Sequence, residues 1–162
     1  MSLRTGTQVA TIIEAIINPN NLKIEGFYCA DDFSKARLIL LGQDIRDFIP
    51  QGVVINDHDV LSESTELIRL KDVLDLRFQL LGKPVITGSK KRIGKVNDYA
   101  VEIETLYIKK LYVAQSILKN LSGGQLSVER NQIIEITNRK VVIQDPLQPT
   151  KSPVSAGAPV TS

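Results

Sequence analysis

The feature that most constrains the fold of this chain is an internal repeat. LKIEGFYC at 22–29 and LYIKKLYV at 106–113 lie 84 positions apart. Leu, Ile, a bulky apolar residue, Tyr and a small apolar residue recur at the same places, whereas the residues between them differ. Because similar blocks at a fixed spacing indicate one structural unit used twice, we expect two copies of a small fold.

The repeat extends well beyond this pair of segments. The aligned blocks are 5–11 with 81–87 (offset 76), 12–29 with 96–113 (offset 84) and 44–57 with 132–145 (offset 88). The growing offsets place one insertion at GSKKRIGK, residues 88–95, and a second in or near the KNLSGGQ sequence. Both are turn sequences, where a duplicated fold tolerates extra residues.

Most of the chain has the character of short β-strands, with Val and Ile runs bounded by Gly, Asn, Asp and Ser. The expected strands are 8–17, 22–29, 36–42, 52–57, 83–87, 92–102, 106–113, 124–128 and 139–145. Many short strands with regular turns predict small antiparallel barrels or sandwiches. A 3.6-residue apolar period predicts a helix at 67–78, and a turn or two of helix is expected at 114–121.

The opening segments also predict an irregularity within a strand. In LYIKKLYV the apolar alternation stops at Ile108 and resumes at Leu111, three positions later, and LKIEGFYC has the same slip. One face can stay inward across such a step only if the strand has one extra residue. We therefore expect β-bulges at Glu25–Gly26 and Lys109–Lys110, the alternative being that the strand ends there. The residues then expected to face the core are Leu106, Ile108, Leu111 and Val113.

Composition places the chain among globular proteins and indicates its compartment. Hydrophobic residues make up 43 %, Trp is absent, and no apolar run approaches the ~18 residues of a membrane span, so we expect an Ile/Leu/Val core and no membrane. The N-terminal sequence lacks a secretory apolar region, and the single Cys excludes an internal disulfide. These features predict a cytoplasmic protein.

The domain organisation follows from the repeat and from one compositional change. Residues 146–162 hold four of the seven prolines and one charge, which predicts a disordered tail because little apolar surface is available for burial. The expected parts are a first unit at 1–62, a linker at 63–79 that is helical in part, a second unit at 80–145 and the tail at 146–162.

The second copy carries a family likeness. Residues 80–113, followed by QIIEITNRKVVIQD, resemble the PRC-barrel family, the small barrel shared by the photosynthetic reaction-centre H subunit and the bacterial ribosome maturation factor. The likeness rests on Gly94, Lys95, Val96 and Asp98 between apolar strands and on the closing VVI strand. It implies an all-β protein of two tandem PRC-like antiparallel β-barrels, and a non-enzymatic adaptor or assembly module.

The residue types offer little for catalysis. Hydrolytic catalysis needs a base beside a nucleophile, but the only His is His58, in the polar turn sequence NDHDV, and Cys29 occupies a core-facing strand position. One His and one Cys in separate segments do not predict a zinc site, and the acidic Asp57 and Asp59 match no calcium loop. We therefore expect no enzyme activity, no cofactor and no metal.

The one surface feature with a functional interpretation is a basic hairpin. It comprises Lys90, Lys91, Arg92 and Lys95, with Lys109 and Lys110 as further candidates. These cations could contact RNA phosphates or an acidic protein face, or they could simply keep an exposed strand soluble.

The sequence therefore predicts a cytoplasmic protein-binding adaptor. Its two units, each marginal alone, are expected to pack together or to form a homodimer. The alternative is an RNA- or ribosome-associated factor in ribosome maturation or RNA processing.

Overall fold

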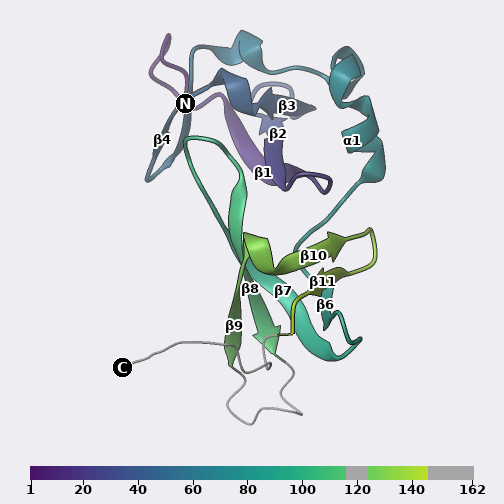
Figure 1. The fold of residues 1–162 in the computed structure, drawn as a ribbon. Coiled ribbons are helices and arrows are strands. Elements are labelled where there is room, and N and C mark those ends of the chain that lie inside the picture. The colour runs from purple at the N-terminus through teal and green to yellow at the C-terminus, as the bar shows by residue number, and fades with distance from the viewer. Residues whose placement is uncertain (116–123, 146–162) are drawn as a thin grey trace.

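The computed structural model describes residues 1–115 and 124–145, and in these ranges the protein is mostly β-structure (Figure 1). The strands are β1 (Ala10–Asn18), β2 (Lys23–Asp31), β3 (Arg37–Leu41), β4 (Ile45–Ile49), β5 (Gly52–Ile55), β6 (Pro84–Thr87), β7 (Arg92–Val101), β8 (Ile108–Gln115), β9 (Gln125–Glu129), β10 (Ile133–Ile136) and β11 (Val141–Ile143). The expected all-β class is confirmed. β4 and β10 were not among the expected strands.

The internal repeat is confirmed by the pairing of the strands. Each copy has three consecutive antiparallel strands, a 3₁₀ turn and a hairpin: β1-β2-β3, η1 (Gly42–Asp44) and β4-β5 in the first, and β7-β8-β9, η5 (Arg130–Gln132) and β10-β11 in the second. Ile12 lies opposite Cys29 as Val96 lies opposite Val113, 84 positions later. The registers of β4-β5 and β10-β11 match at an offset of 88.

The predicted bulges are present in both copies. Ile16 and Ile17 are consecutive on β1 but lie opposite Gly26 and Ile24, so Glu25 is the extra residue. On β8 the extra residue is Lys109, at the matching position. The four residues expected to face the core do so, since Leu106 is 9 % exposed and Ile108, Leu111 and Val113 are 0 % exposed.

The first pair of aligned blocks was wrong. Thr87 pairs in parallel with Ile143, and its counterpart, which pairs with Ile55, is Ser2 rather than Thr11. Both hydroxyls are fully buried and accept a turn N–H, from Lys91 to Thr87 (3.0 Å) and from Arg4 to Ser2 (3.2 Å). The true offset is 85, so residues 88–95 are no insertion. The shared letters, GxxVxT, reflected turn composition rather than equivalent positions.

The expectation of two tandem antiparallel β-barrels was also wrong. The second repeat is an open six-stranded sheet in the order β10-β11-β6-β7-β8-β9, and the first consists of the sheet β1-β2-β3 and the separate hairpin β4-β5. β9 and β10 are joined by the three residues of η5, which turn the chain without pairing the two end strands. In the second repeat β6 pairs with both β7 and β11, whereas in the first repeat no described strand pairs with both β1 and β5.

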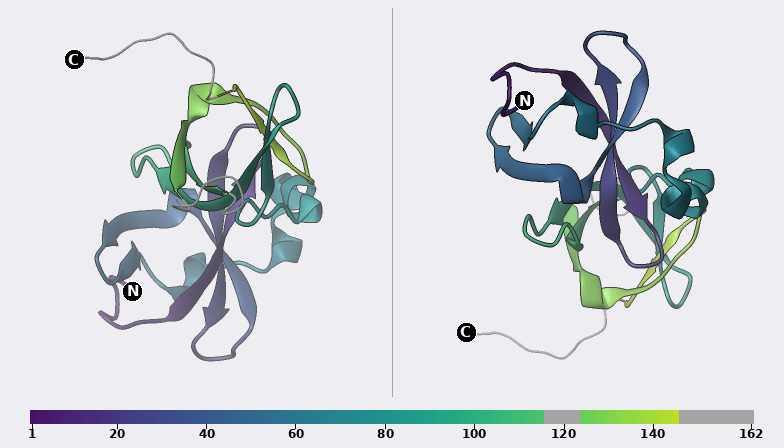
Figure 2. Two further views of the ribbon diagram at one scale, coloured as in Figure 1. Left: turned by 90° about the horizontal axis from the view of Figure 1, so that it is seen from below. Right: turned by 90° about the horizontal axis from the view of Figure 1, so that it is seen from above.

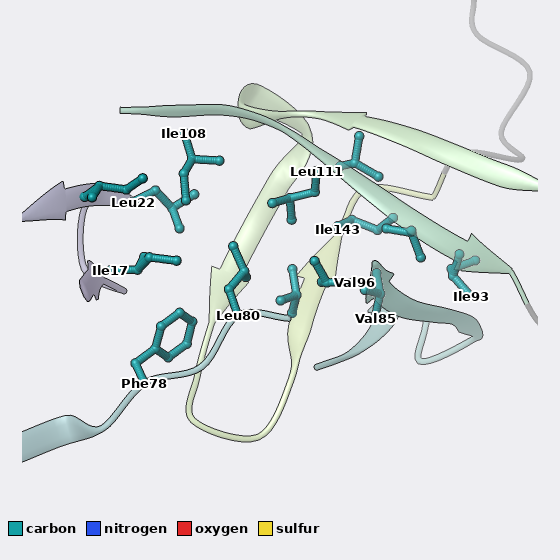
Figure 3. Close-up of a cluster of buried hydrophobic side chains, with 14 of the residues drawn as sticks. Ile17, Leu22, Phe78, Leu80, Val85, Ile93, Val96, Ile108, Leu111 and Ile143 are labelled. Atoms are coloured by element: carbon teal, nitrogen blue, oxygen red, sulfur yellow. The ribbon is translucent and has the colours of Figure 1, made fainter. Parts of the chain in front are cut away.

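One apolar core extends across both repeats (Figure 3). Ile17, Leu22 and Ile24 of the first repeat belong to the same buried cluster as Ile108 and Leu111 of the second. A smaller cluster of Val9, Cys29, Leu40 and Ile55 lies within the first repeat. Cys29 is therefore the core residue that its strand position predicted. Burial raises the pKa of its thiol.

The two repeats meet through a reciprocal pair of backbone hydrogen bonds. The N–H of Ile24 donates to the carbonyl of Leu106 (2.9 Å), and the N–H of Ile108 donates to the carbonyl of Leu22 (2.9 Å). Ile24 and Ile108 are repeat counterparts, as are Leu22 and Leu106, so the junction has the self-complementary form of a two-fold interface. The expected packing of the two units is confirmed within one chain.

The linker covers one side of this arrangement (Figure 2). It contains η3 (Ser64–Glu66), η4 (Ile68–Leu70) and α1 (Lys71–Leu76), so the helix predicted over 67–78 is present in its middle part. Ala114 and Gln115 end β8, and the rest of the helix predicted at 114–121 lies outside the described residues, as does the tail at 146–162. Across 1–115 and 124–145, no helix is both long enough and apolar enough to cross a bilayer.

Gly94→Ala tests the close approach of β7 to β8. A Cβ at Gly94 would overlap the carbonyl of Ala114, a backbone atom that cannot rotate away. We expect a loss of about 2 kcal/mol in the free energy of unfolding, because overfilling a packed site forces the backbone to move. Urea denaturation measures it. Gly88→Ala is the control, with ordinary contact at 3.4 Å from Ile134 and an expected change below about 0.5 kcal/mol. Equal effects would contradict the argument.

Candidate protein-binding groove

A groove of about 820 Å³ lies where the first repeat, the linker and the β7–β8 turn come together. Its walls are formed by residues 23–25, 41–43, 66–70 and 103–106, with Ile45 and Phe48. Figure 1 shows the long β7–β8 hairpin rising from the second repeat to the first, which places its turn there. Three segments that are distant in sequence therefore share one surface.

The groove sits where the near two-fold symmetry is broken. Gly42 begins η1, and its counterpart at the start of η5 is Arg130. Arg130 donates through its guanidinium to the carbonyls of Ile108 (3.2 Å) and Asn21, and the same group lies 5.1 Å from the centre of the Tyr107 ring. The arginine thus fills its side of the junction. Gly42 has no side chain to do so.

On the Gly42 side, Lys23 is the counterpart of Tyr107. Leu106 occupies part of the space beside Gly42. A Cβ built on Gly42 would lie 2.6 Å from Cδ1 of Leu106. Leu106 is 9 % exposed, and it is one of the apolar residues that line the groove. With glycine in place of arginine, this side of the junction lacks the hydrogen bonds that Arg130 makes, and it borders the groove with Leu106 in its wall.

The chemistry of the groove suits an amphipathic protein surface. Ile68 on the linker is 82 % exposed and Ile103 on the β7–β8 turn is 59 % exposed. Charged residues of both signs line the same groove: Glu25, Glu66 and Glu104, and Lys23 and Arg69. Protein–protein contacts usually combine apolar side chains with charged ones. Scattered exposed isoleucines would need no explanation, but these two share one hollow.

The basic hairpin is exposed, as its sequence suggested. Thr87 and Lys91 close its turn with backbone and hydroxyl bonds, and Lys90 adopts a left-handed conformation at φ 70°. The side chains of Lys90, Lys91, Arg92 and Lys95 have no described ion pair or aromatic neighbour. The cation–ring contacts found in the described residues involve Lys23, Arg37, Lys83 and Arg130 instead. Of the two further candidates, Lys109 is exposed, whereas Lys110 is paired with Glu129 at 3.4 Å.

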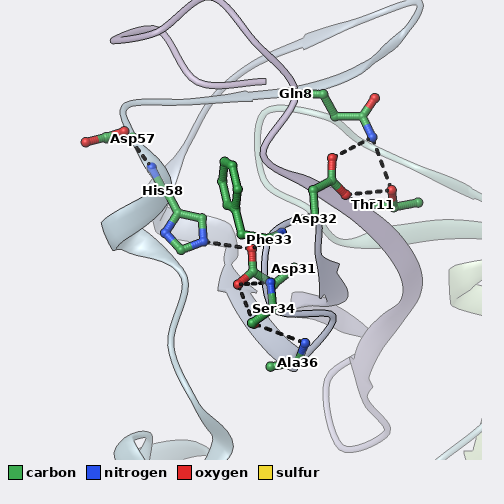
Figure 4. Close-up of polar contacts among 9 residues, drawn as sticks. All are labelled: Gln8, Thr11, Asp31, Asp32, Phe33, Ser34, Ala36, Asp57 and His58. Carbon is green, nitrogen blue, oxygen red and sulfur yellow. Dashed lines mark hydrogen bonds and ion pairs between the residues drawn. The ribbon is translucent and has the colours of Figure 1, made fainter.

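The histidine is part of a polar cluster that sequence reasoning missed (Figure 4). Its Nε2 lies 2.9 Å from Oδ1 of Asp31, a residue that is 5 % exposed, and the hydroxyl of Ser34 donates to Oδ2 of Asp31 at 2.6 Å. The bond from Ser34, with those from His58 and the backbone N–H groups of Phe33 and Ser34, holds the pKa of Asp31 far below its ordinary value.

This cluster has the geometry of a structural fastening. Ser34 and His58 both bond to the carboxylate of Asp31, so the histidine is not placed to take a proton from the serine hydroxyl. The arrangement ties the β2–β3 turn to η2 (His58–Val60). Asp57 caps the start of η2: its side chain accepts the N–H of His58 (2.8 Å) and pairs with Arg4 (2.8 Å). These bonds lower the pKa of Asp57. Within the described ranges, no cluster of His, Cys, Asp and Glu is suited to hold a metal ion.

The groove could have been found only in part from sequence. The aligned block began at residue 44, and extending it two positions back would have set Gly42 against Arg130. The contribution of Ile68 and Ile103 depends on how the linker and a turn fold over the first repeat, which no local pattern encodes. In comparisons with known proteins, the chain matches no protein-family model and no curated protein sequence.

Arg130→Ala tests the filled side of the junction. It removes charged hydrogen bonds to the carbonyls of Ile108 and Asn21, and we expect the free energy of unfolding to fall by about 2 kcal/mol. Arg139→Ala is the control, because Arg139 is exposed and its side chain has no described partner, and it should change stability by less than about 0.5 kcal/mol. If the two variants denature alike in urea, Arg130 does not support the junction.

Asp31→Asn tests whether the contacts of the Asp31 carboxylate with Ser34 and His58 weaken in acid. Since its folded pKa lies below the unfolded value of about 4, its contribution is present above that value and is lost as the pH falls towards the folded pKa. Asp31→Asn should melt at a lower temperature than the wild type at pH 7, and the gap should narrow between pH 5 and pH 2.5. Asp59→Asn, at an exposed position, should show no such narrowing. Thermal melts across this range are the measurement, and a constant gap would contradict the assignment.

Proposed function

We propose that this protein is a non-enzymatic, cytoplasmic adaptor or assembly module built from two PRC-like repeats, and that it binds a partner protein in the groove beside Gly42. The observation that carries the proposal is the placing of two exposed isoleucines, Ile68 and Ile103, in one hollow that the symmetry-related side of the junction fills with Arg130. The PRC-barrel resemblance supports an adaptor role in general terms.

The energetics favour apolar contact as the source of affinity. Burying one isoleucine side chain contributes about 1.5–3 kcal/mol, so two at the centre of an interface are worth a large part of a micromolar affinity. The mixed charges of Glu66, Glu104 and Arg69 would then select the partner and set its orientation, because rim charges act more on specificity than on affinity.

The alternative function is RNA or ribosome association through the basic hairpin. Four exposed cations without a described partner would attract phosphates, but sequence-tolerant binding of single strands usually adds aromatic side chains on which bases stack. The described surroundings of Lys90–Arg92 and Lys95 supply no such ring. The groove is therefore the better supported site.

Affinity capture from native lysate tests the proposal with a matched set of variants. Immobilised wild type is compared with the double variant Ile68→Lys, Ile103→Lys, and with Ile134→Lys, which places the same charge at another exposed isoleucine. We expect a defined set of proteins that the wild type and the Ile134 variant retain and that the double variant loses by at least about tenfold, with the melting temperature unchanged.

Two outcomes would contradict the proposal. One is equal retention by the wild type and the double variant. The other is retention that disappears on ribonuclease treatment or at raised salt and that is lost instead when Lys90, Lys91, Arg92 and Lys95 are replaced by Ser, which would favour the RNA alternative.

A further inference from the structure

The filled side and the groove side of the junction differ in what meets a pair of backbone carbonyls. On the filled side, the guanidinium of Arg130 donates to the carbonyls of Ile108 (3.2 Å) and Asn21. At the repeat offset of 84, the counterparts of these two residues are Ile24 and Thr105, and both line the groove. The groove therefore contains the carbonyl pair that corresponds to the one occupied by an arginine on the other side.

The backbone around the two carbonyl pairs has the same local bonding. The side-chain oxygen of Asn21 accepts the N–H of Lys23 (3.0 Å), and that of Thr105 accepts the N–H of Tyr107 (3.3 Å). The reciprocal backbone bonds of the junction then fix both strands relative to these turns. The two pairs consequently lie in equivalent places on opposite sides of the junction.

The carbonyl pair of the groove has no side-chain donor within the described ranges. The N–H of Ile24 donates across the junction to Leu106, and its carbonyl points the same way because both groups of a strand residue face one edge. That carbonyl oxygen lies 3.7 Å from the place of a Cβ on Gly42. Ile24 is only 3 % exposed, and an acceptor in so buried a residue favours a ligand that brings N–H groups.

The charges beside the two pairs also differ. The groove residues Glu25 and Glu104 have Lys109 and Asn20 as their counterparts on the filled side. The side that has its own arginine thus carries a further cation, whereas the side without one carries two carboxylates. Opposite charge within a few ångströms favours an incoming cation.

Two cations of the chain line the groove as well, but neither is bonded to the carbonyl pair. The ammonium of Lys23 lies 5.7 Å from the centre of the Tyr107 ring, the ring that Arg130 also contacts. Arg69, in η4, has no hydrogen bond to Ile24 or Thr105 in the part of the chain that the structure describes. The arginine that would complete this side must therefore come from another molecule.

We propose that the groove binds an arginine side chain of the partner protein, whose guanidinium bonds to the carbonyls of Ile24 and Thr105, a role that rests on the groove being the protein-binding site. Arginine suits the pair better than lysine because its planar guanidinium donates to two acceptors at once. Cδ1 of Leu106 lies 2.6 Å from the place of a Cβ on Gly42, so the arginine enters from the open side. Apolar residues beside it in the partner would contact Ile68 and Ile103.

The test compares two end-capped tripeptides of equal charge, Leu-Arg-Leu and Leu-Lys-Leu. Each is titrated into the isotopically labelled full chain and followed by two-dimensional NMR of the backbone amides. We expect the arginine peptide to shift the amides of Gly42 and Thr105 saturably. The lysine peptide should bind at least about fivefold more weakly.

Two substitutions in the chain locate the binding. Gly42→Arg restores the arginine of the filled side once the flexible end of Leu106 moves aside, and it should weaken binding of the arginine peptide at least about tenfold. Gly88→Arg, the same change at an exposed turn, should leave binding unchanged. Glu104→Gln, also at an exposed position, should weaken binding about threefold, an effect that does not require the Gly42 variant to fold.

Three results would overturn the inference. One is equal binding of the two peptides, which would leave the groove as a protein-binding site without selection for arginine. Another is the absence of saturable shifts at Gly42 and Thr105. The third is a loss of stability in Arg69→Ala as large as in Arg130→Ala, because the chain would then fill the pair itself. Capture of partners from lysate is measured separately, so the proposed function and the arginine site succeed or fail independently.

Discussion

The structure depends on the reciprocal backbone bonds between Leu22–Ile24 and Leu106–Ile108. To make them, Leu22 and Leu106 adopt left-handed conformations, at φ 58° and 63°, which cost a non-glycine residue about 1–2 kcal/mol each. The same turn directs both leucine side chains into the shared core, where Leu22 is 6 % and Leu106 is 9 % exposed. Backbone strain is thus offset by burial at the junction of the two repeats.

The junction also completes the burial of the first repeat. The cluster within this repeat holds four buried apolar residues, whereas Ile17, Leu22 and Ile24 are buried in the larger cluster that the second repeat completes. In the second repeat, β6 pairs with both β7 and β11. Two differences between the copies stand out: Ile12 is 40 % exposed where the second repeat has the buried Val96, and Gly42 stands where the second repeat has Arg130.

Sequence reasoning succeeded where the information was local and periodic. The recurrence of LKIEGFYC as LYIKKLYV predicted the repeat. The slip in the apolar alternation of both segments predicted the bulges and the inward residues, because the two-residue side-chain period of a strand leaves few alternatives. It failed where the answer depended on distant pairing. The match of 5–11 with 81–87 followed residue types that are common in turns. The parallel β-bridge between Ser2 and Ile55 instead makes Ser2 the counterpart of Thr87. Whether the sheets close into barrels, whether Asp31 contacts His58 and where the groove lies likewise depend on contacts between segments tens of residues apart.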